Sequence, residues 1–342
     1  MPAVATSAFL RAARREPLER TPIWLMRQAG RSLPEYRKLR ERWKLVEIVA
    51  QPELCAEVTL QPVRRLGVDA AVMFADIMLP VAGMGVEFEL VEDVGPVIAS
   101  PVRSADDVAR LQVPDPRESV PQVLAAIRQV AAESPVPVIC FTGGPFTLAS
   151  YLIEGRPTRD FKLVKAFMYQ EPEAFDLLLQ KLSQMAAGYL KAQVDAGAQA
   201  LQVFDSWMGA LAVEDYETRV LPHTRAIFRS TASLGVPRIH FGTNTGGLLE
   251  LMAAAGPDVV SVDWHVPLDI AWGRIGELGI QGNLEPAVLL GPRRLVVERA
   301  RDVLRRAHGR PGHIFNLGHG VLPETPLENL QALVETVHEW RT

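Results

Sequence analysis

The sequence predicts an α/β protein with a (β/α)8 barrel fold, and two observations carry this prediction. Eight short apolar runs rich in β-branched residues are spread along the 342 residues, and helical patterns fill most of the intervals between them. The runs do not alternate between apolar and polar residues, which is typical of strands buried on both faces of a parallel sheet. Eight strand-then-helix units in order are the plan of a closed barrel.

Residues that favour turns or carry charge follow each predicted strand. The eight strands are expected at residues 22–26, 70–74, 136–141, 198–204, 237–241, 259–262, 279–281 and 313–316. Such an ordered series fits a barrel more simply than a Rossmann sheet. The Rossmann alternative is weakened further because no Gly-x-Gly-x-x-Gly motif follows any of these runs.

Helices are predicted where apolar residues recur at helical spacing. Four such patterns each end at a glycine, which is the usual residue just beyond a helix. They cover residues 52–66, 172–196, 214–234 and 289–308, and a fifth pattern covers 326–340. We expect the fifth to close the barrel.

The interval 80–135 is too long for an ordinary connection, so it must carry structure of its own. Residues 86–91 alternate in polarity and are followed by an apolar pair across Gly95-Pro96, which predicts a hairpin. Two helices should follow, one starting at Ser104 and one over 120–132. We therefore expect one domain over 1–342, with an insertion at about 81–135 between strands two and three.

Composition narrows the class of protein. The apolar content of 48% and charged content of 22% are those of a soluble globular chain, and the net charge of −4 gives no indication of nucleic-acid or membrane binding. Cys55 and Cys140 lie in apolar settings, so buried thiols are expected in place of a disulfide or metal site. Without a secretory signal or a membrane-length apolar run, we expect a cytoplasmic protein.

The residues after the strands are the candidates for function, because they form the active face of a barrel. They are Arg27, Arg31, Asp76, Ser206, Asn244, Asp263, Asn283 and His319. The two arginines after a buried strand indicate an anion site, since guanidinium offers a planar fork of donors to carboxylate or phosphate.

Structural roles compete with functional ones at several of these positions. Asn244 and Asn283 are typical turn and cap residues, and that interpretation is favoured. Asp263 fits a buried partner that ties loops together as well as a substrate contact, and Asp76 fits an ion pair with an arginine. The glycines beside His319 should let its backbone approach another group closely and leave the imidazole exposed.

Several chemistries are excluded by missing motifs. The chain has no Walker loop, no His-Glu-x-x-His, no Cys/His cluster with zinc spacing and no Gly-x-Ser-x-Gly elbow. Any reaction must proceed without an obvious metal, nucleotide or nucleophile.

Two long motifs resemble the signatures of the uroporphyrinogen decarboxylase family. The first is Pro22-Ile-Trp-Leu-Met-Arg-Gln-Ala-Gly-Arg31, and the second runs from Gly143-Gly-Pro-Phe-Thr-Leu148 to Tyr151-Leu-Ile-Glu-Gly155. Shorter matches follow in order at 74–77, 204–207, 263–264, 281–284 and 316–320. The resemblance covers essentially the whole chain.

This resemblance implies a barrel enzyme that works without a cofactor or metal, often as a homodimer. Such an enzyme converts the four acetate side chains of uroporphyrinogen III to methyl groups, giving coproporphyrinogen III in haem biosynthesis. Carried over by position, Arg27 and Arg31 are substrate-carboxylate ligands in the same segment as Gln28, Ala29 and Gly30. Asp76 is the aspartate that meets the pyrrole N–H groups. The remaining implied positions are carboxylate contacts at Tyr151, Ser206 and His319 and apolar walls at Phe74 and Phe204.

The implied reaction suits these residue types. Loss of carbon dioxide leaves electron density on carbon, and a pyrrole protonated at carbon can accept it, so Asp76 is expected to stabilise a cationic ring. The proton donor stays open between Arg27, His319 and water. Arginine is a poor acid because its pKa exceeds about 12, whereas unperturbed histidine titrates near about 6.5.

The chain departs from the family pattern at two positions, and other activities remain to be weighed. Glu285 stands where aspartate is expected, and Trp207 follows Ser206 where some members have histidine. A related zinc-dependent methyltransferase branch uses a His-x-Cys pair, and the corresponding His240-Phe241-Gly242 lacks the thiolate. A non-catalytic tetrapyrrole-binding protein is the second alternative, although a scaffold would not need Asp76.

Overall fold

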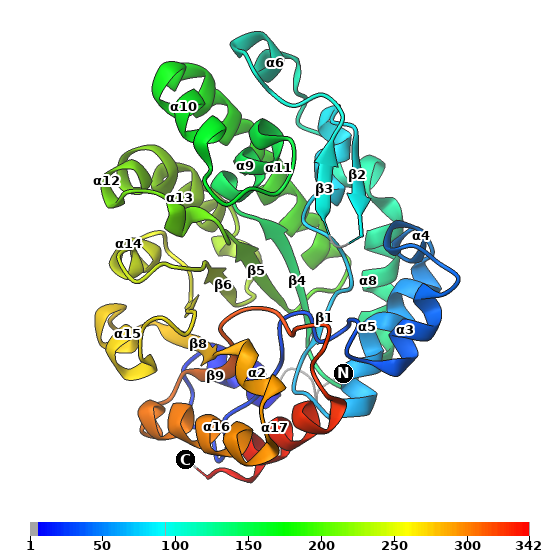
Figure 1. Cartoon of the computed structure of the whole chain (residues 1–342), viewed down its shortest axis with the longest axis vertical. Helices are drawn as coiled ribbons and strands as arrows, with labels where there is room; N and C mark the ends of the chain where they lie inside the picture. Colours follow the sequence, from blue (N-terminus) through cyan, green and yellow to red (C-terminus); the bar gives the residue numbers. More distant parts are fainter. Residues whose placement is uncertain (1–5, 93, 342) are drawn as a thin grey trace.

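The computed structural model describes residues 6–92 and 94–341, and a parallel sheet of seven strands lies at its centre. The strands follow the order β1-β4-β5-β6-β7-β8-β9. Figure 1 shows them curled into a barrel with helices outside. Their bounds are β1 Ala71–Val72, β4 Val138–Gly143, β5 Ala200–Phe204, β6 Arg238–Phe241, β7 Val259–Ser261, β8 Gly279–Leu284 and β9 His313–Leu317. The α/β barrel prediction is therefore confirmed.

Residues 22–26 lie between β9 and β1 and close the barrel, but they do not form the regular strand that was predicted. Ile23 makes a single parallel bridge to Phe315, and its carbonyl accepts a bond from Asp69 N on the other side. Trp24 N still donates to Phe315 O at 3.4 Å, but beyond it the ladder stops, because amide side chains accept the next two backbone N–H groups. Leu25 N donates to Gln28 Oε1 at 2.9 Å, and Met26 N donates to Asn316 Oδ1 at 3.0 Å.

Helices cover the outside of the sheet, as Figure 1 shows. Those predicted at 52–66, 172–196, 289–308 and 326–340 are found as α5, α11, α16 and α17. The outer helices are α5 Pro52–Leu66, α8 Pro121–Glu133, α11 Pro172–Asp195, α13 Leu221–Ser230, α14 Leu249–Ala254, α15 Leu268–Arg274, α16 Arg293–Ala307 and α17 Leu327–Glu339. Each of these helices has an apolar stripe along one side, and it packs that stripe against the strands.

The predicted helix 214–234 is broken into shorter pieces. A short helix α12 (Val213–Asp215) leads into a π-helical turn η3 (Tyr216–Val220), which precedes α13, and a 3-10 turn η4 (Ala232–Leu234) ends the segment. Pro222 has no N–H to donate to the preceding turn. A widened turn at this point accommodates the missing bond.

Between β1 and β4 the chain forms a 3-10 turn η1 (Leu79–Met84) and an antiparallel hairpin before three helices. The hairpin pairs β2 (Phe88–Val91) with β3 (Gly95–Ile98). It and α6 (Ala105–Arg110) lie at the edge of the molecule in Figure 1, whereas α8 packs beside α5. The short helix α7 (Pro116–Ser119) lies between α6 and α8 in the chain.

Short helices after the closing segment and after β4 complete the face that surrounds the strand ends. They are α3 Pro34–Arg40 and α4 Leu45–Val49 on one side, and α9 Pro145–Glu154 and α10 Lys162–Gln170 on the other. α9 begins immediately after β4, so it brings Tyr151 to the mouth of the barrel.

The helix α2 (Ala8–Ala13), which the sequence reading did not anticipate, closes the amino-terminal end of the barrel. Phe9 and Leu10 pack into a cluster with Trp24 and with strand residues such as Ile139 and Ile314. Arg15, just after the helix, packs against Gly312 before β9. This helix therefore covers the amino-terminal ends of the strands, and the carboxyl-terminal ends lie at the opposite side of the barrel.

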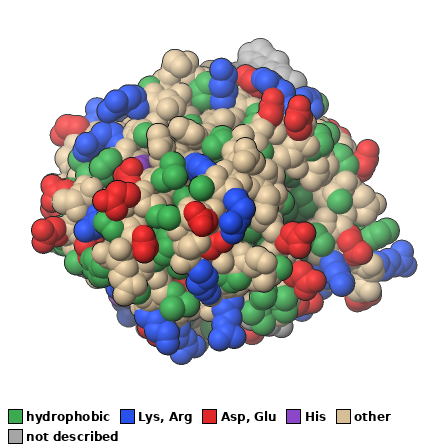
Figure 2. All heavy atoms as spheres, turned by 90° about the horizontal axis from the view of Figure 1, so that it is seen from above, with side chains coloured by type: hydrophobic (Ala, Val, Ile, Leu, Met, Phe, Trp, Pro, Cys, Tyr) green, Lys and Arg blue, Asp and Glu red, His purple; other side chains and the backbone are tan. Residues whose placement is uncertain are grey.

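The surface charges and the two cysteines are arranged as the composition predicts. Figure 2 shows acidic and basic side chains interspersed over one face, without an extended patch of either charge. Cys55 and Cys140 are both buried and free. Within the described ranges, no helix has the length and apolar character needed to cross a bilayer.

Candidate active site

Arg27 occupies a tight turn at the end of the closing segment. Gln28 N donates to Leu25 O at 2.9 Å, which closes the turn, and Arg27 has a φ of +60°. This left-handed region favours glycine or asparagine, because a Cβ there costs on the order of 1–2 kcal/mol. An exposed arginine at such a position indicates a function for its side chain.

The segment after β9 lies directly against Arg27. Val321 N donates to Met26 O at 2.9 Å, immediately before the arginine. A Cβ built on Gly320 would lie 2.4 Å from Arg27 Cδ and 2.7 Å from Cγ. The stem of the arginine therefore crosses the glycine at van der Waals range.

Asp76 follows β1, which is the neighbour of the closing segment. Its Oδ1 accepts a bond from Met78 N at 2.8 Å. Some of the side chain reaches solvent, yet protein atoms surround the carboxyl closely, and this desolvation raises its pKa. The bond from Met78 and the positive charge of Arg27 act in the opposite direction, so Asp76 and Arg27 share one electrostatic environment.

Tyr151 of α9 joins the same environment. Burial raises the pKa of its phenol, and the charge of Asp76 adds to this effect. A side-chain hydrogen bond with Trp207 and the charge of Arg27 lower that pKa, and the two rings lie 6.5 Å apart. Arg27, Asp76 and Tyr151 therefore lie close enough for the charges of Arg27 and Asp76 to act on the phenol, although the three residues belong to different segments.

His319 also belongs to this group, but its imidazole is half-buried and the prediction of an exposed ring is wrong. Burial, and then the charge of Arg27, lower the pKa of His319 to about 4, while Asp263 opposes the shift. The predicted close backbone approach is confirmed, because a Cβ on Gly318 would lie 2.8 Å from Trp264 N. The loop that carries His319 therefore packs tightly against the loop after β7.

Aromatic side chains line the barrel beneath these polar groups. Phe204 lies 5.1 Å from Phe141 and 5.6 Å from Phe241, ring centre to ring centre. The Phe241 ring is 6.1 Å from His319. Phe74 is mostly buried and meets the edge of Tyr36, so Phe204 is the more accessible of the two predicted apolar walls.

The remaining residues of the first motif differ in their accessibility. Gln28 is fully buried, and its Nε2 donates to Ala70 O at 2.9 Å while its Oε1 holds Leu25 N. Its side chain is thus engaged in closing the barrel. Ala29, Gly30 and Arg31 are half-buried on the segment above.

Ser206 lies half-buried after β5. Its backbone carbonyl accepts a bond from Thr243 Oγ1 at 2.6 Å, which fixes the loop to the one that follows β6. The hydroxyl is thereby carried at the mouth on a loop held from both sides.

Asp263 ties neighbouring loops together, as the structural interpretation of this residue expected. It is 2% exposed, and its carboxylate accepts bonds from the backbone N–H groups of Asn244 and His265. Asn244 has a left-handed φ of +55°. Asn283 Nδ2 donates to the carbonyls of Asp263 and Val266 at 2.9 and 2.7 Å. The turn interpretation therefore fits Asn244, whereas it is wrong for Asn283, which lies within β8 and pairs with Asn316.

Asp205 holds two segments of the candidate site together, and it was not among the residues predicted for the site. It is fully buried, and its Oδ1 accepts bonds from Thr147 N at 2.9 Å and Thr147 Oγ1 at 2.7 Å. Trp207 N donates to the same hydroxyl at 3.0 Å. Desolvation raises the pKa of Asp205 to about 6. Its place at a strand end, inside a matched motif, was the available signal.

His240 lies away from the mouth. It is fully buried, its ring is 5.3 Å from Phe228, and burial lowers its pKa to about 4. Across the described residues, no group of three or more His, Cys, Asp or Glu side chains is arranged to hold a metal ion.

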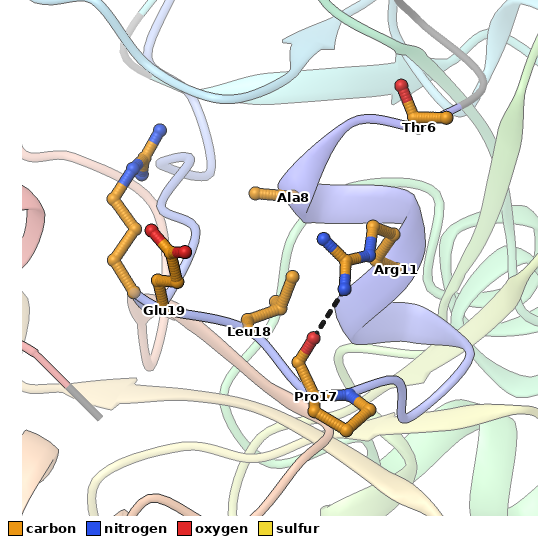
Figure 3. A pocket seen from close by; sticks show the side chains of 7 residues that line it. Thr6, Ala8, Arg11, Pro17, Leu18 and Glu19 are labelled. Carbon is orange, nitrogen blue, oxygen red and sulfur yellow. Dashed lines mark hydrogen bonds between the residues drawn. The ribbon is translucent and has the colours of Figure 1, made fainter.

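A separate pocket of about 510 Å³ opens beside α2, far from the strand ends that carry Arg27 and Asp76. Figure 3 shows Arg11 in this pocket, donating to the carbonyl of Pro17. The pocket is lined by Thr6, Ala8, Arg11, Pro17, Leu18, Glu19 and Arg20. It shares no lining residue with the group around Arg27.

Comparisons with known proteins give a consistent result. A family model described as "Uroporphyrinogen decarboxylase (URO-D)" matches residues 5–340. Proteins named uroporphyrinogen decarboxylase are similar to the chain. The one from Carboxydothermus hydrogenoformans is 52% identical over 97% of this chain and 95% of its own. The one from Thermus thermophilus is 54% identical over 97% of each chain.

Solved structures with low sequence identity share the fold. A methyltransferase from Methanosarcina mazei superposes with a TM-score of 0.82, at 20% identity over 97% of each chain. A B12-independent methionine synthase from a Shewanella species gives a TM-score of 0.55 at 11% identity, over 87% of this chain and 90% of its own. At these identities the likeness extends to the architecture alone.

Proposed function

Because this chain belongs to the uroporphyrinogen decarboxylase family, we propose that it is a carboxy-lyase acting on uroporphyrinogen III. It removes the carboxyl groups of the four acetate side chains and releases coproporphyrinogen III, a step of porphyrin and haem biosynthesis. The observation that carries the proposal beyond the family is the electrostatic group of Arg27, Asp76, Tyr151 and His319 at one barrel mouth.

Asp76 is assigned to the centre of the substrate. When a pyrrole is protonated at carbon, the ring becomes cationic and can accept the electron pair left by carbon dioxide. A carboxylate beside the ring stabilises that cation. The desolvation that raises the pKa of Asp76 also strengthens its attraction to a cation, because the surroundings screen charge weakly.

Arg27 and Arg31 are assigned to substrate carboxylates. A substrate with many carboxylates repels itself, and bidentate guanidinium partners offset that repulsion. Tyr151, Ser206 and His319 supply further polar contacts, while Phe74 and Phe204 support the flat faces of the ring. The backbone around Gln28, Ala29 and Gly30 completes the binding segment.

The proton that replaces each lost carboxylate comes from Arg27, His319 or a water molecule in this proposal. The lowered pKa of His319 keeps its imidazole neutral near pH 7 in the free protein. A substrate carboxylate beside the ring would favour the protonated form, because an opposite charge stabilises imidazolium.

The proposal extends to the protein as a whole. The chain acts as one barrel domain over residues 1–342, with residues 81–135 as an insertion beside the barrel. It works without a cofactor, as a homodimer in the cytoplasm, and with no nucleic-acid or membrane partner.

One assay tests the activity directly. The purified protein is incubated anaerobically with uroporphyrinogen III, and the products are separated by chromatography after oxidation to porphyrins. We expect coproporphyrin to appear with carbon dioxide. Tight binding of the porphyrin without any loss of carboxyl groups would instead favour a tetrapyrrole-binding protein.

A further inference from the structure

We propose that Gly320 is a positioning residue that sets the direction of the Arg27 guanidinium, together with Asn316 of the same segment. The inference rests on the proposed function, in which Arg27 binds a substrate carboxylate. In this inference Gly320 does not touch the substrate itself, but it determines where the Arg27 guanidinium lies when it binds the carboxylate.

Gly320 is required by space and not by backbone conformation. Its φ is not among the positive values that favour glycine, so the backbone there would accept a residue with a Cβ. Such a Cβ would lie 2.4 Å from Arg27 Cδ, 2.7 Å from Cγ and 3.0 Å from Nε. The last three atoms before the guanidinium carbon therefore rest on the glycine.

The same segment also holds the backbone from which Arg27 projects. Asn316 is fully buried, and its Oδ1 accepts Met26 N at 3.0 Å and Leu317 N at 2.8 Å. Val321 N donates to Met26 O at 2.9 Å. Both polar backbone groups of Met26 are thus bonded to residues on either side of Gly320.

These contacts link two site residues into one unit. His319 lies between the segment's contacts to Arg27 and to Trp264. Arg27 and His319 therefore keep a fixed spacing, although they belong to opposite ends of the sequence. A substrate whose carboxylates match this spacing binds without the cost of ordering a long side chain.

The first test replaces Gly320 by alanine. The clashing atoms belong to a flexible side chain, so the protein should fold with a near-normal melting temperature while Arg27 turns away. We expect kcat/KM for uroporphyrinogen III to fall on the order of 10²-fold, as for a binding group displaced by about 1 Å. Gly188→Ala in α11 is the matched control, because nothing lies within 4 Å of its Cβ position.

The second test repeats the substitution in an Arg27→Ala background. Binding is followed with uroporphyrin III, the oxidised fluorescent form of the substrate, because this background should turn over slowly. With the arginine stem absent, Gly320→Ala should change the Kd by less than about twofold. An equal loss of binding or of folding in both backgrounds would overturn the proposal, as would normal kcat/KM in Gly320→Ala alone.

The two proposals fail separately. If the wild-type protein does not convert uroporphyrinogen III, the proposed activity is wrong, while the binding comparison still measures the coupling of Gly320 to Arg27. If conversion is normal and the coupling is absent, only the positioning role is wrong.

Discussion

Arg27 joins a permanent charge to a backbone conformation that costs free energy. Its φ of +60° is strained for a residue with a Cβ, and glycine at this position would remove that strain. The turn is nevertheless held by hydrogen bonds: Gln28 Oε1 and Asn316 Oδ1 accept from Leu25 N and Met26 N, and Val321 N donates to Met26 O. The protein thus maintains local strain in order to present a guanidinium at the barrel mouth.

This strain predicts that two substitutions of Arg27 differ in stability although both lower the activity. Arg27→Gly should be more stable to urea than Arg27→Ala by about 1 kcal/mol, because only the alanine keeps a Cβ in the left-handed region. Both variants should decarboxylate poorly, since both lack the guanidinium. Equal stabilities, or a less stable glycine variant, would argue against strain at this turn.

Asp76 predicts a separation of turnover from binding. Asp76→Asn keeps the shape of the side chain and removes its charge, so kcat should fall roughly 10²–10³-fold, with a smaller change in uroporphyrin binding. Asp106→Asn, at an exposed position on α6, is the matched control. Near-normal turnover in purified Asp76→Asn would remove the role proposed for this carboxylate.

The sequence predicted which residues lie at the barrel mouth, but not how they are arranged there. Arg27, Asp76 and His319 were found because they follow predicted strands. The partial burial of His319 was not predicted, because it depends on contacts between residues far apart in the sequence, such as the one between the His319 and Phe241 rings. The burial of Gln28 was hidden for the same reason, since its partners lie in the closing segment and before β1.

At the scale of elements, Asp205 and Thr147 form a junction between two parts of the site. Thr147 is in the first turn of α9, where an anionic partner suits the helix N-terminus. Its hydroxyl also accepts Trp207 N, on the loop after β5. One threonine therefore aligns the helix that carries Tyr151 with the loop that carries Ser206.

This junction predicts a difference between two substitutions of similar size. Thr147→Val should lower the free energy of unfolding by about 1–3 kcal/mol, because buried groups of Asp205 and Trp207 lose their partner. Thr147→Ser keeps the hydroxyl and should lose little of this stability. Urea unfolding curves distinguish the two, and equal losses in both variants would exclude a role for the hydroxyl.

The elements were predictable where periodicity alone decides them. The pattern over Pro52–Leu66 predicted α5 and its glycine end, because one apolar stripe faces the strands. The segment 22–26 has the same apolar character as a strand, but two amide side chains replace its ladder. The helix α2 was not predicted, because its 6 residues are too few to show helical periodicity.

For the molecule as a whole, buried histidines link stability to pH. Desolvation lowers the pKa values of His240 and His313 to about 4. Below about pH 6.5 the unfolded chain gains protons that the folded protein does not, so these residues cost stability as pH falls. Asp205 acts in the opposite sense, because its raised pKa of about 6 lets the folded protein take up a proton first.

Replacement of His240 should isolate one of these contributions. In His240→Phe the loss of stability between pH 6.5 and pH 5 should be smaller than in the wild type by about 1 kcal/mol per pH unit on average, because the unfolded histidine is only half protonated at pH 6.5. Steric effects of the new ring are the same at each pH and cancel in this difference. Parallel pH dependence of the two proteins in urea unfolding would contradict a neutral, buried His240.

The contact between Arg27 and the segment after β9 has a consequence for the making of the protein. Met26 and Asn316 are 290 residues apart, and a ribosome adding about 5–20 residues per second needs about 15–60 s to travel between them. Throughout that time the nascent chain carries Arg27 without the residues that aim it. A growing chain can therefore assemble the proposed substrate site only after β9 has been synthesised, however early its first residues leave the ribosome.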